Sequence, residues 1–126
     1  MKRFILGLVV LSRLLGVGAV VSVLFEFVHE PTADYLEDAA QASLAGDWDK
    51  ARELFDQAQE RWEDWRDFTA AFSDHGPMDE IEGLFSQLEV YAVQKNYAYF
   101  PALCAKLASL AQAMADSHRL QWWTLL

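Results

Sequence analysis

Cysteine is almost absent from this 126-residue chain, which contains only Cys104. A single cysteine excludes an intramolecular disulfide and any zinc site built on two or more cysteines. Cys104 lies among apolar residues at helical spacing, so we expect a buried and unreactive thiol. The alternative is a disulfide between two chains.

Basic residues are scarce beyond the N-terminus. Residues 29–126 contain 7 Lys and Arg against 18 Asp and Glu, and the whole chain has a net charge of −9. A surface of this sign repels phosphate backbones and anionic lipid headgroups, so we expect no nucleic-acid partner. The acidity indicates a soluble surface and points to no particular ligand.

Motifs of known chemistry are also missing. The chain has no Gly-rich phosphate loop, nucleophile elbow, His-Glu-x-x-His or paired-Cys motif. His29 and His118 stand alone near expected helix ends, where an imidazole usually meets solvent or exposed carbonyls. One group could bind a divalent metal or transfer a proton, and it comprises Asp74, His75, Asp79 and Glu80. The same residues form an ordinary helix-capping turn, so we predict no catalytic residue, no cofactor, no metal site and no enzyme activity.

An apolar stretch dominates the N-terminus. Residues 4–28 are interrupted only by Arg13 and Glu26, and as a helix they would extend about 37 Å, which is enough to span a membrane. Lys2 and Arg3 precede the stretch, and the positive-inside rule keeps them in the cytoplasm. We therefore predict a transmembrane signal anchor at residues 1–28, in contact with lipid, and a domain at residues 29–126 outside the cell membrane.

A cleaved signal peptide is the alternative interpretation of this stretch. Its best small-residue cleavage site is Val17-Gly18-Ala19. Cleavage there would leave the apolar residues 20–28 at the mature N-terminus, and this favours the uncleaved anchor.

Arg13 places a charge about ten residues into the apolar stretch. Its long side chain can reach back toward the cytoplasmic headgroups. Alternatively it pairs with a carboxylate of a partner membrane protein, because charges inside a membrane are costly and often functional. Ser12, Gly16 and Ala19 form a stripe of small residues that would permit close contact with another helix.

The rest of the chain follows helical spacing, and no strand pattern competes with it. Pro31 precedes an Ala-rich segment at residues 32–45, which Gly46-Asp47 ends while capping the next helix. Apolar side chains at alternating spacings of three and four then run from residue 48 to residue 72: Trp48, Ala51, Phe55, Ala58, Trp62, Trp65, Thr69 and Phe72. At this spacing the tryptophans are core residues rather than a platform for a ligand.

Two further helices are expected in the second half. One begins at about Pro77 and ends near Lys95-Asn96-Tyr97, and the last covers about residues 98–118 with Pro101 in its first turn. We therefore predict an all-α fold, in which an N-terminal transmembrane helix is followed by a small antiparallel helical bundle of about four helices.

The C-terminal tail is too apolar to extend freely into water. Trp122, Trp123, Leu125 and Leu126 follow the last expected helix. We expect this tail to dock at the membrane-proximal end, against headgroups or a partner. Packing back across the open end of the bundle is the alternative.

Two resemblances extend this interpretation. The spacing of Ala51, Phe55 and Ala58 after Gly46-Asp47-Trp48 resembles the second helix of a tetratricopeptide repeat, although the signature of the first helix is missing. A wider pattern runs from the hydrophobic N-terminus through Trp62, Trp65, the Asp74-His75 turn and residues 81–91 to the ending Ser117-His118-Arg119-Leu120-Gln121-Trp122-Trp123. It resembles a bacterial domain-of-unknown-function family numbered 4363.

The wider resemblance implies a small membrane-anchored protein with a helical remainder and no established activity. We expect a non-enzymatic interaction or accessory module, with a membrane protein as its partner. The alternatives are an exported helical domain that binds a small ligand or metal between its helices, and a tetratricopeptide-like hairpin that binds protein.

Overall fold

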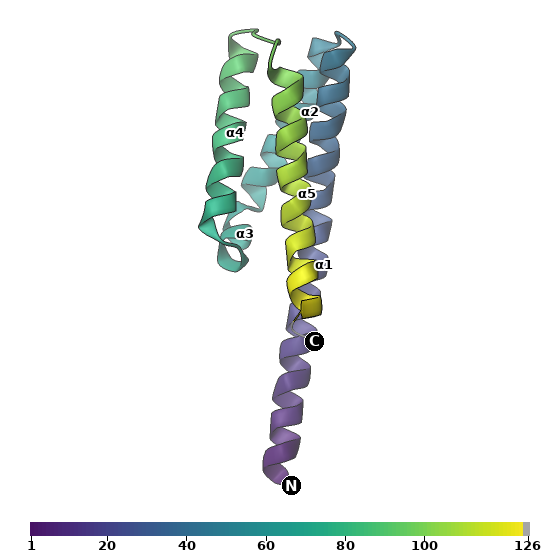
Figure 1. Ribbon diagram of the computed structural model, residues 1–126, viewed down its shortest axis with the longest axis vertical. Helices are drawn as coiled ribbons and strands as arrows, with labels where there is room; N and C mark the ends of the chain where they lie inside the picture. The colour runs from purple at the N-terminus through teal and green to yellow at the C-terminus, as the bar shows by residue number, and fades with distance from the viewer. Residues whose placement is uncertain (125–126) are drawn as a thin grey trace.

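The computed structural model describes the backbone of residues 1–124 and the side chains of residues 1–116. Within this part the chain forms five α-helices and no strand, which confirms the all-α prediction (Figure 1). The helices are α1 (Lys2–Leu44), α2 (Trp48–Asp64), α3 (Arg66–Phe72), α4 (His75–Val93) and α5 (Phe100–Thr124). Residues 125 and 126 lie outside the described residues.

The first helix is much longer than the sequence predicts. α1 runs for 43 residues and contains Pro31 in its interior, so its length is about 64 Å. The expected anchor and the expected helix at residues 32–45 are therefore one element, and no helix boundary falls after Val28. A proline inside a helix removes one hydrogen bond and costs about 3 kcal/mol, so the continuity of α1 needs a compensating contact.

The turn after α1 follows the predicted chemistry. Gly46 adopts a positive φ of 79°, which glycine tolerates without the steric cost of a side chain. Asp47 then caps α2, because its side chain accepts a hydrogen bond of 3.3 Å from the backbone N–H of Lys50. The chain reverses here, and α2 returns along α1 (Figure 1).

The predicted helix over residues 48–72 is divided in two. Trp65 interrupts it with φ −107° and ψ 8°, ending α2 and starting α3. Phe55, Trp62 and Thr69 of the predicted stripe are buried, whereas Trp65 is half-buried and Phe72 is exposed. The stripe therefore faces the core up to the break and leaves it at the end of α3.

The last two helices lie close to their predicted positions. α4 begins at His75, two residues before Pro77. The connection to α5 contains Lys95 at a positive φ of 54°, and the N–H of Asn96 donates to the carbonyl of Tyr91 at 2.9 Å. α5 starts at Phe100 and holds Pro101 in its first turn, but it runs on to Thr124 instead of ending near His118.

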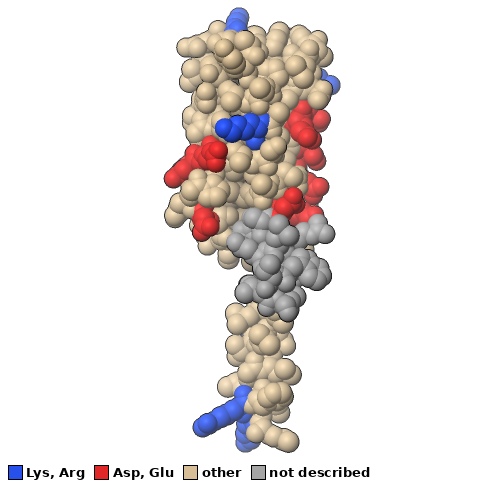
Figure 2. All heavy atoms as spheres, in the orientation of Figure 1, with Lys and Arg blue, Asp and Glu red and all other residues tan. Residues whose placement is uncertain are grey.

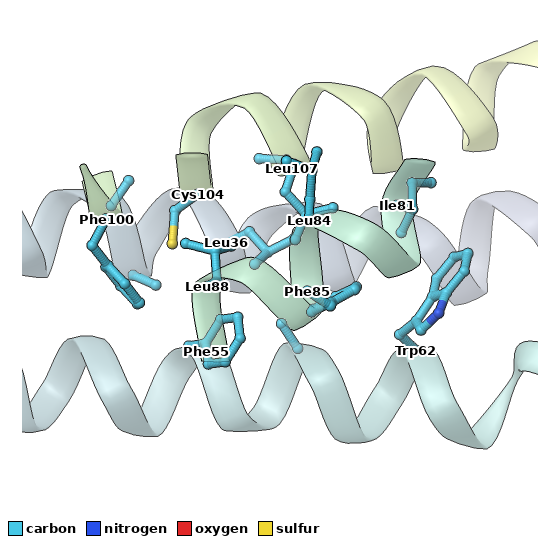
Figure 3. Close-up of a cluster of buried hydrophobic side chains, with 14 of the residues drawn as sticks. Leu36, Phe55, Trp62, Ile81, Leu84, Phe85, Leu88, Phe100, Cys104 and Leu107 are labelled. Atoms are coloured by element: carbon cyan, nitrogen blue, oxygen red, sulfur yellow. The ribbon is translucent and has the colours of Figure 1, made fainter. Parts of the chain in front are cut away.

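Apolar side chains from four of the helices form the core shown in Figure 3. α1 and α5 lie side by side (Figure 1), and both carry buried alanines, which permit close approach of two backbones. Cys104 on α5 is fully buried, and this desolvation raises the pKa of its thiol to about 12. The expected burial of the cysteine is thus confirmed.

Candidate functional site at the junction of the apolar segment and the helical domain

α1 changes its surroundings within one turn. Residues 4–24, which we call the apolar segment, contain no buried side chain, and Val23 is 64% exposed. Phe25 is 0% exposed and starts the helical domain, which we define as residues 25–124. Figure 2 shows the largely uncharged surface of this segment between basic side chains at the N-terminal tip and acidic side chains on the visible face of the domain. α1 is long and apolar enough to cross a membrane.

The length of the apolar segment matches a bilayer. Its 21 residues extend about 31 Å, close to the roughly 30 Å of a hydrocarbon core. Arg13 is its tenth residue and is exposed. An arginine at the centre of a membrane helix costs about 2.5 to 3.5 kcal/mol on insertion, so in a membrane this position would be expensive unless another group compensated the charge.

Arg61 of α2 supplies the contact that Pro31 makes necessary. Because Pro31 has no N–H, the carbonyl of Phe27 four residues earlier has no donor within its own helix. The Nη2 of Arg61 donates to this carbonyl at 3.0 Å, and its Nε donates to the carbonyl of Val28, also at 3.0 Å. The planar guanidinium thus bonds two successive carbonyls of α1 at the same time.

Two more contacts complete this junction. The guanidinium of Arg61 lies over the ring of Phe27, 5.8 Å from its centroid, which adds a cation–π attraction. The hydroxyl of Thr32 also reaches the carbonyl of Val28, at 3.4 Å. The backbone around Pro31 is therefore held by side chains of α1 and α2, and we call this set of contacts the Pro31–Arg61 clamp.

His29 lies in the domain interior, which corrects the expectation of an isolated imidazole near a helix end. It is 1% exposed in the middle of α1, and its ring centroid lies 5.3 Å from that of Phe25 and 5.6 Å from that of Trp62. Its Nε2 is 3.0 Å from Oγ1 of Thr69 on α3. Thr69 donates its hydroxyl proton to the carbonyl of Trp65 at 2.8 Å, so Nε2 of His29 is the donor in this pair.

This polar pair explains the position of α3. Phe25 contacts the rings of Phe68 and Phe72 at centroid distances of 5.3 and 6.4 Å, while His29 bonds Thr69 on the same short helix. The break at Trp65 turns α3 so that it covers the start of the buried half of α1. Sequence reasoning missed His29, although its spacing of four from Phe25 and three from Thr32 places it on the buried face.

A cavity of about 200 Å³ opens between α2 and α4. Trp62 lines it, is 3% exposed, and its indole Nε1 has no hydrogen-bond partner among the described residues. Arg66 and Glu82, which also line the cavity, form an ion pair. A second ion pair between α2 and α4 joins Arg52 to Glu89 at 2.8 Å. The hydrogen bond to Glu89 raises the pKa of Arg52. The cavity could hold a small polar ligand of a few non-hydrogen atoms.

The acidic group around His75 is not assembled into a site. His75 is the exposed first residue of α4, and Asp74 precedes it without a side-chain capping bond. Across the described side chains, no three His, Cys, Asp or Glu residues come together in a way that could hold a metal ion.

The predicted C-terminal surface is only partly visible. Trp122 and Trp123 fall in the last turns of α5, not after the last helix. These turns lie beside the part of α1 that leaves the domain (Figure 1). Their side chains, together with Leu125 and Leu126, lie outside the described residues.

The comparison with known proteins places the chain in a family. The family described as Domain of unknown function (DUF4363) matches residues 24–123. The chain belongs to this family. The match begins one residue before Phe25, the first buried side chain of the helical domain, and it covers Pro31, Arg61 and the whole junction. No curated protein and no solved structure shows a significant match to the chain. The family membership confirms the predicted resemblance and transfers no activity.

Proposed function

We propose that this chain is a single-pass membrane protein whose helical domain acts outside the cytoplasm as a non-enzymatic interaction or accessory module. The observation that carries the proposal is the continuity of α1 from the exposed apolar segment into the domain core. The N-terminal half of α1 is apolar on nearly all sides, as in a helix surrounded by lipid. The C-terminal half is apolar on one face, as in a helix that packs on a folded domain.

The orientation follows from charge. Lys2 and Arg3 precede the apolar segment, and the chain beyond it is acidic. Positive residues stay on the cytoplasmic side of a single span, so the helical domain belongs outside. The Pro31–Arg61 clamp supports an interaction role, because it holds the domain at a set angle to the segment that crosses the membrane.

Reporter fusions at Leu126 test this proposal. An enzyme reporter that is active only outside the cytoplasm should work there, and a cytoplasmic reporter should not. Cytoplasmic activity would contradict the proposed orientation. The mass of the mature chain must be measured as well, because cleavage after Ala19 would remove no buried residue of the domain. If the main product is a soluble cleaved form, the apolar segment is a signal peptide and not an anchor.

A second candidate function is binding of a small ligand by an exported domain. It is favoured by the cavity between α2 and α4, which Trp62 lines. The indole Nε1 of Trp62 is buried and has no hydrogen-bond partner among the described residues. Native mass spectrometry of the protein purified from its membrane should then show a bound small molecule. The variant Trp62→Phe keeps an aromatic ring and removes the donor, so it should lose that mass. If the natural chain and Trp62→Phe give the same spectra, ligand binding through Trp62 is excluded and only the interaction role remains proposed.

A further inference from the structure

The helical domain fixes the depth of Arg13 in the membrane. Phe25 and Val28 are buried in the domain, so lipid cannot surround α1 beyond Leu24. On the other side, Lys2 and Arg3 belong at the cytoplasmic headgroups. Arg13 is nine residues from Phe4, which is about 14 Å along the helix axis. The middle of a hydrocarbon core lies about 15 Å from its edge, so Arg13 lies close to the midplane.

Sliding of the helix cannot bring Arg13 to the headgroups. A shift toward the cytoplasm by two or three turns would pull Glu26, Glu30 and the attached domain into the hydrocarbon. A shift in the other direction would bury Lys2 and Arg3. Either movement would take Arg13 out of the hydrocarbon but bring at least two other charged residues into it, at a greater cost. The position of the single span therefore keeps Arg13 near the centre of the bilayer.

The apolar segment offers this guanidinium no partner of its own. Residues 4–24 contain no Asp or Glu, and the residues one turn before and after Arg13 are Val9, Val10, Gly16 and Val17. A second parallel copy of the chain would place another arginine at the same depth, and like charges repel. A carboxylate from a different chain would neutralise the charge at this depth.

We propose that Arg13 pairs, near the bilayer midplane, with an Asp or Glu on a transmembrane helix of a different protein. This inference rests on the single span proposed above and names the chemistry of the partner. Gly16 lies one turn from Arg13, and a Cβ placed there would meet nothing within 4 Å. A partner helix can therefore approach α1 closely beside the charge.

The test uses the full chain in phosphatidylcholine vesicles, with a fluorescent donor on the helical domain. The probe is a synthetic Leu-Ala transmembrane peptide that carries an acceptor and one Glu at its centre. Energy transfer should report association on the order of tenfold stronger for the natural chain than for Arg13→Leu. A peptide with central Leu instead of Glu should not distinguish the two chains.

A depth control sharpens the result. Adding Val20→Arg to the Arg13→Leu variant restores one arginine on nearly the same face, about 10 Å from its original depth. Association with the central-Glu peptide should stay low in this variant. Equal association of the natural chain and Arg13→Leu with that peptide would overturn the proposal. Stronger self-association of the natural chain than of Arg13→Leu would also overturn it.

Accessibility labelling separates failure of this inference from failure of the single span. In a Cys104→Ala background, Glu30→Cys should react with an impermeant maleimide added outside spheroplasts, and Lys2→Cys should react only after permeabilisation. If both react from outside, or neither does, the span itself is wrong. If labelling follows the expected pattern and energy transfer does not depend on Arg13, only the intramembrane pairing is wrong.

Discussion

The two halves of α1 share one continuous backbone and meet opposite surroundings. The apolar segment exposes Phe4, Leu8 and Val23 by more than half of their surface, whereas Phe25 and Leu36 in the second half are fully buried. Both halves contain large apolar side chains, so residue type alone does not separate them. Charged residues do: no charged side chain of the second half is fully buried, and the apolar segment contains only Arg13.

Phe25→Ala should have the largest effect in this comparison. Removing a fully buried phenylalanine ring is expected to destabilise the helical domain by about 3 to 5 kcal/mol. Phe4→Ala is the matched control, because Phe4 is 76% exposed on the same helix and contributes nothing to the domain core. Guanidinium unfolding in detergent, followed by tryptophan fluorescence, measures both. Similar losses of stability would mean that the two halves do not differ as described.

The Pro31–Arg61 clamp is the next test, because it joins the second half of α1 to α2. Arg61→Met keeps the length of the side chain and removes both hydrogen bonds to α1. We expect a loss of about 2 kcal/mol, in the range for bonds from a charged donor. Pro31→Ala restores the N–H that the carbonyl of Phe27 lacks.

The two clamp substitutions should therefore be coupled. In the Pro31→Ala background, Arg61→Met should cost roughly 1 kcal/mol less than in the natural chain, and a double-mutant cycle of unfolding free energies gives this difference. Additive effects would show that Arg61 stabilises the domain without compensating for the proline.

The reactivity of Cys104 tests whether the core, which the second half of α1 helps to form, is closed to solvent. Its thiol pKa is raised to about 12 by burial, so thiol reagents at pH 8 should react only when the domain unfolds. Ser109→Cys in a Cys104→Ala background is the control, because residue 109 is exposed on the same helix and should react at once.

The same raised pKa predicts a pH dependence. The folded state keeps the thiol proton to higher pH than the unfolded state, whose thiol titrates near 9.0. The natural chain should therefore lose stability relative to Cys104→Ala as the pH rises from about 9 toward 12. Urea unfolding at pH 7, 9 and 10 would check it, and a constant difference between the two chains would contradict the burial of the thiol.

Arg52 should show the smallest effect. Its ion pair with Glu89 joins α2 to α4 at the surface, with more than a third of each side chain exposed. Arg52→Met is expected to cost less than about 1 kcal/mol, and the cost should shrink further in high salt. A loss as large as that of Arg61→Met would show that surface charges, and not bonds to the α1 backbone, hold α2 in place.

Sequence patterns predicted those parts of the fold whose cause is local. Gly46-Asp47 marks a turn because glycine supplies the positive φ and aspartate supplies the cap, both within four residues. Pro101 marks the first turn of α5 for the same reason. These features need no knowledge of distant residues.

The features that the sequence did not predict depend on distant partners. α1 continues through Pro31 because Arg61, 30 residues later, bonds the carbonyls of Phe27 and Val28. His29 is buried because Thr69, 40 residues away, bonds its ring. The candidate site at the junction consists of such pairs, so periodicity alone indicated the apolar segment and Arg13 but gave no indication of the clamp.

The unbroken α1 also means that, in the proposed membrane-spanning arrangement, a tilt of the apolar segment would displace the whole domain. Residues 25–44 extend about 30 Å beyond the apolar segment. A membrane helix tilts by an average of about 20° and adjusts this angle to bilayer thickness. Because α1 does not hinge at Pro31, a tilt of that size carries the turn at Gly46 sideways by about 10 Å. If the apolar segment spans a bilayer as proposed, the domain would act as a lever, and a partner that contacts its far end would sense the thickness of the membrane.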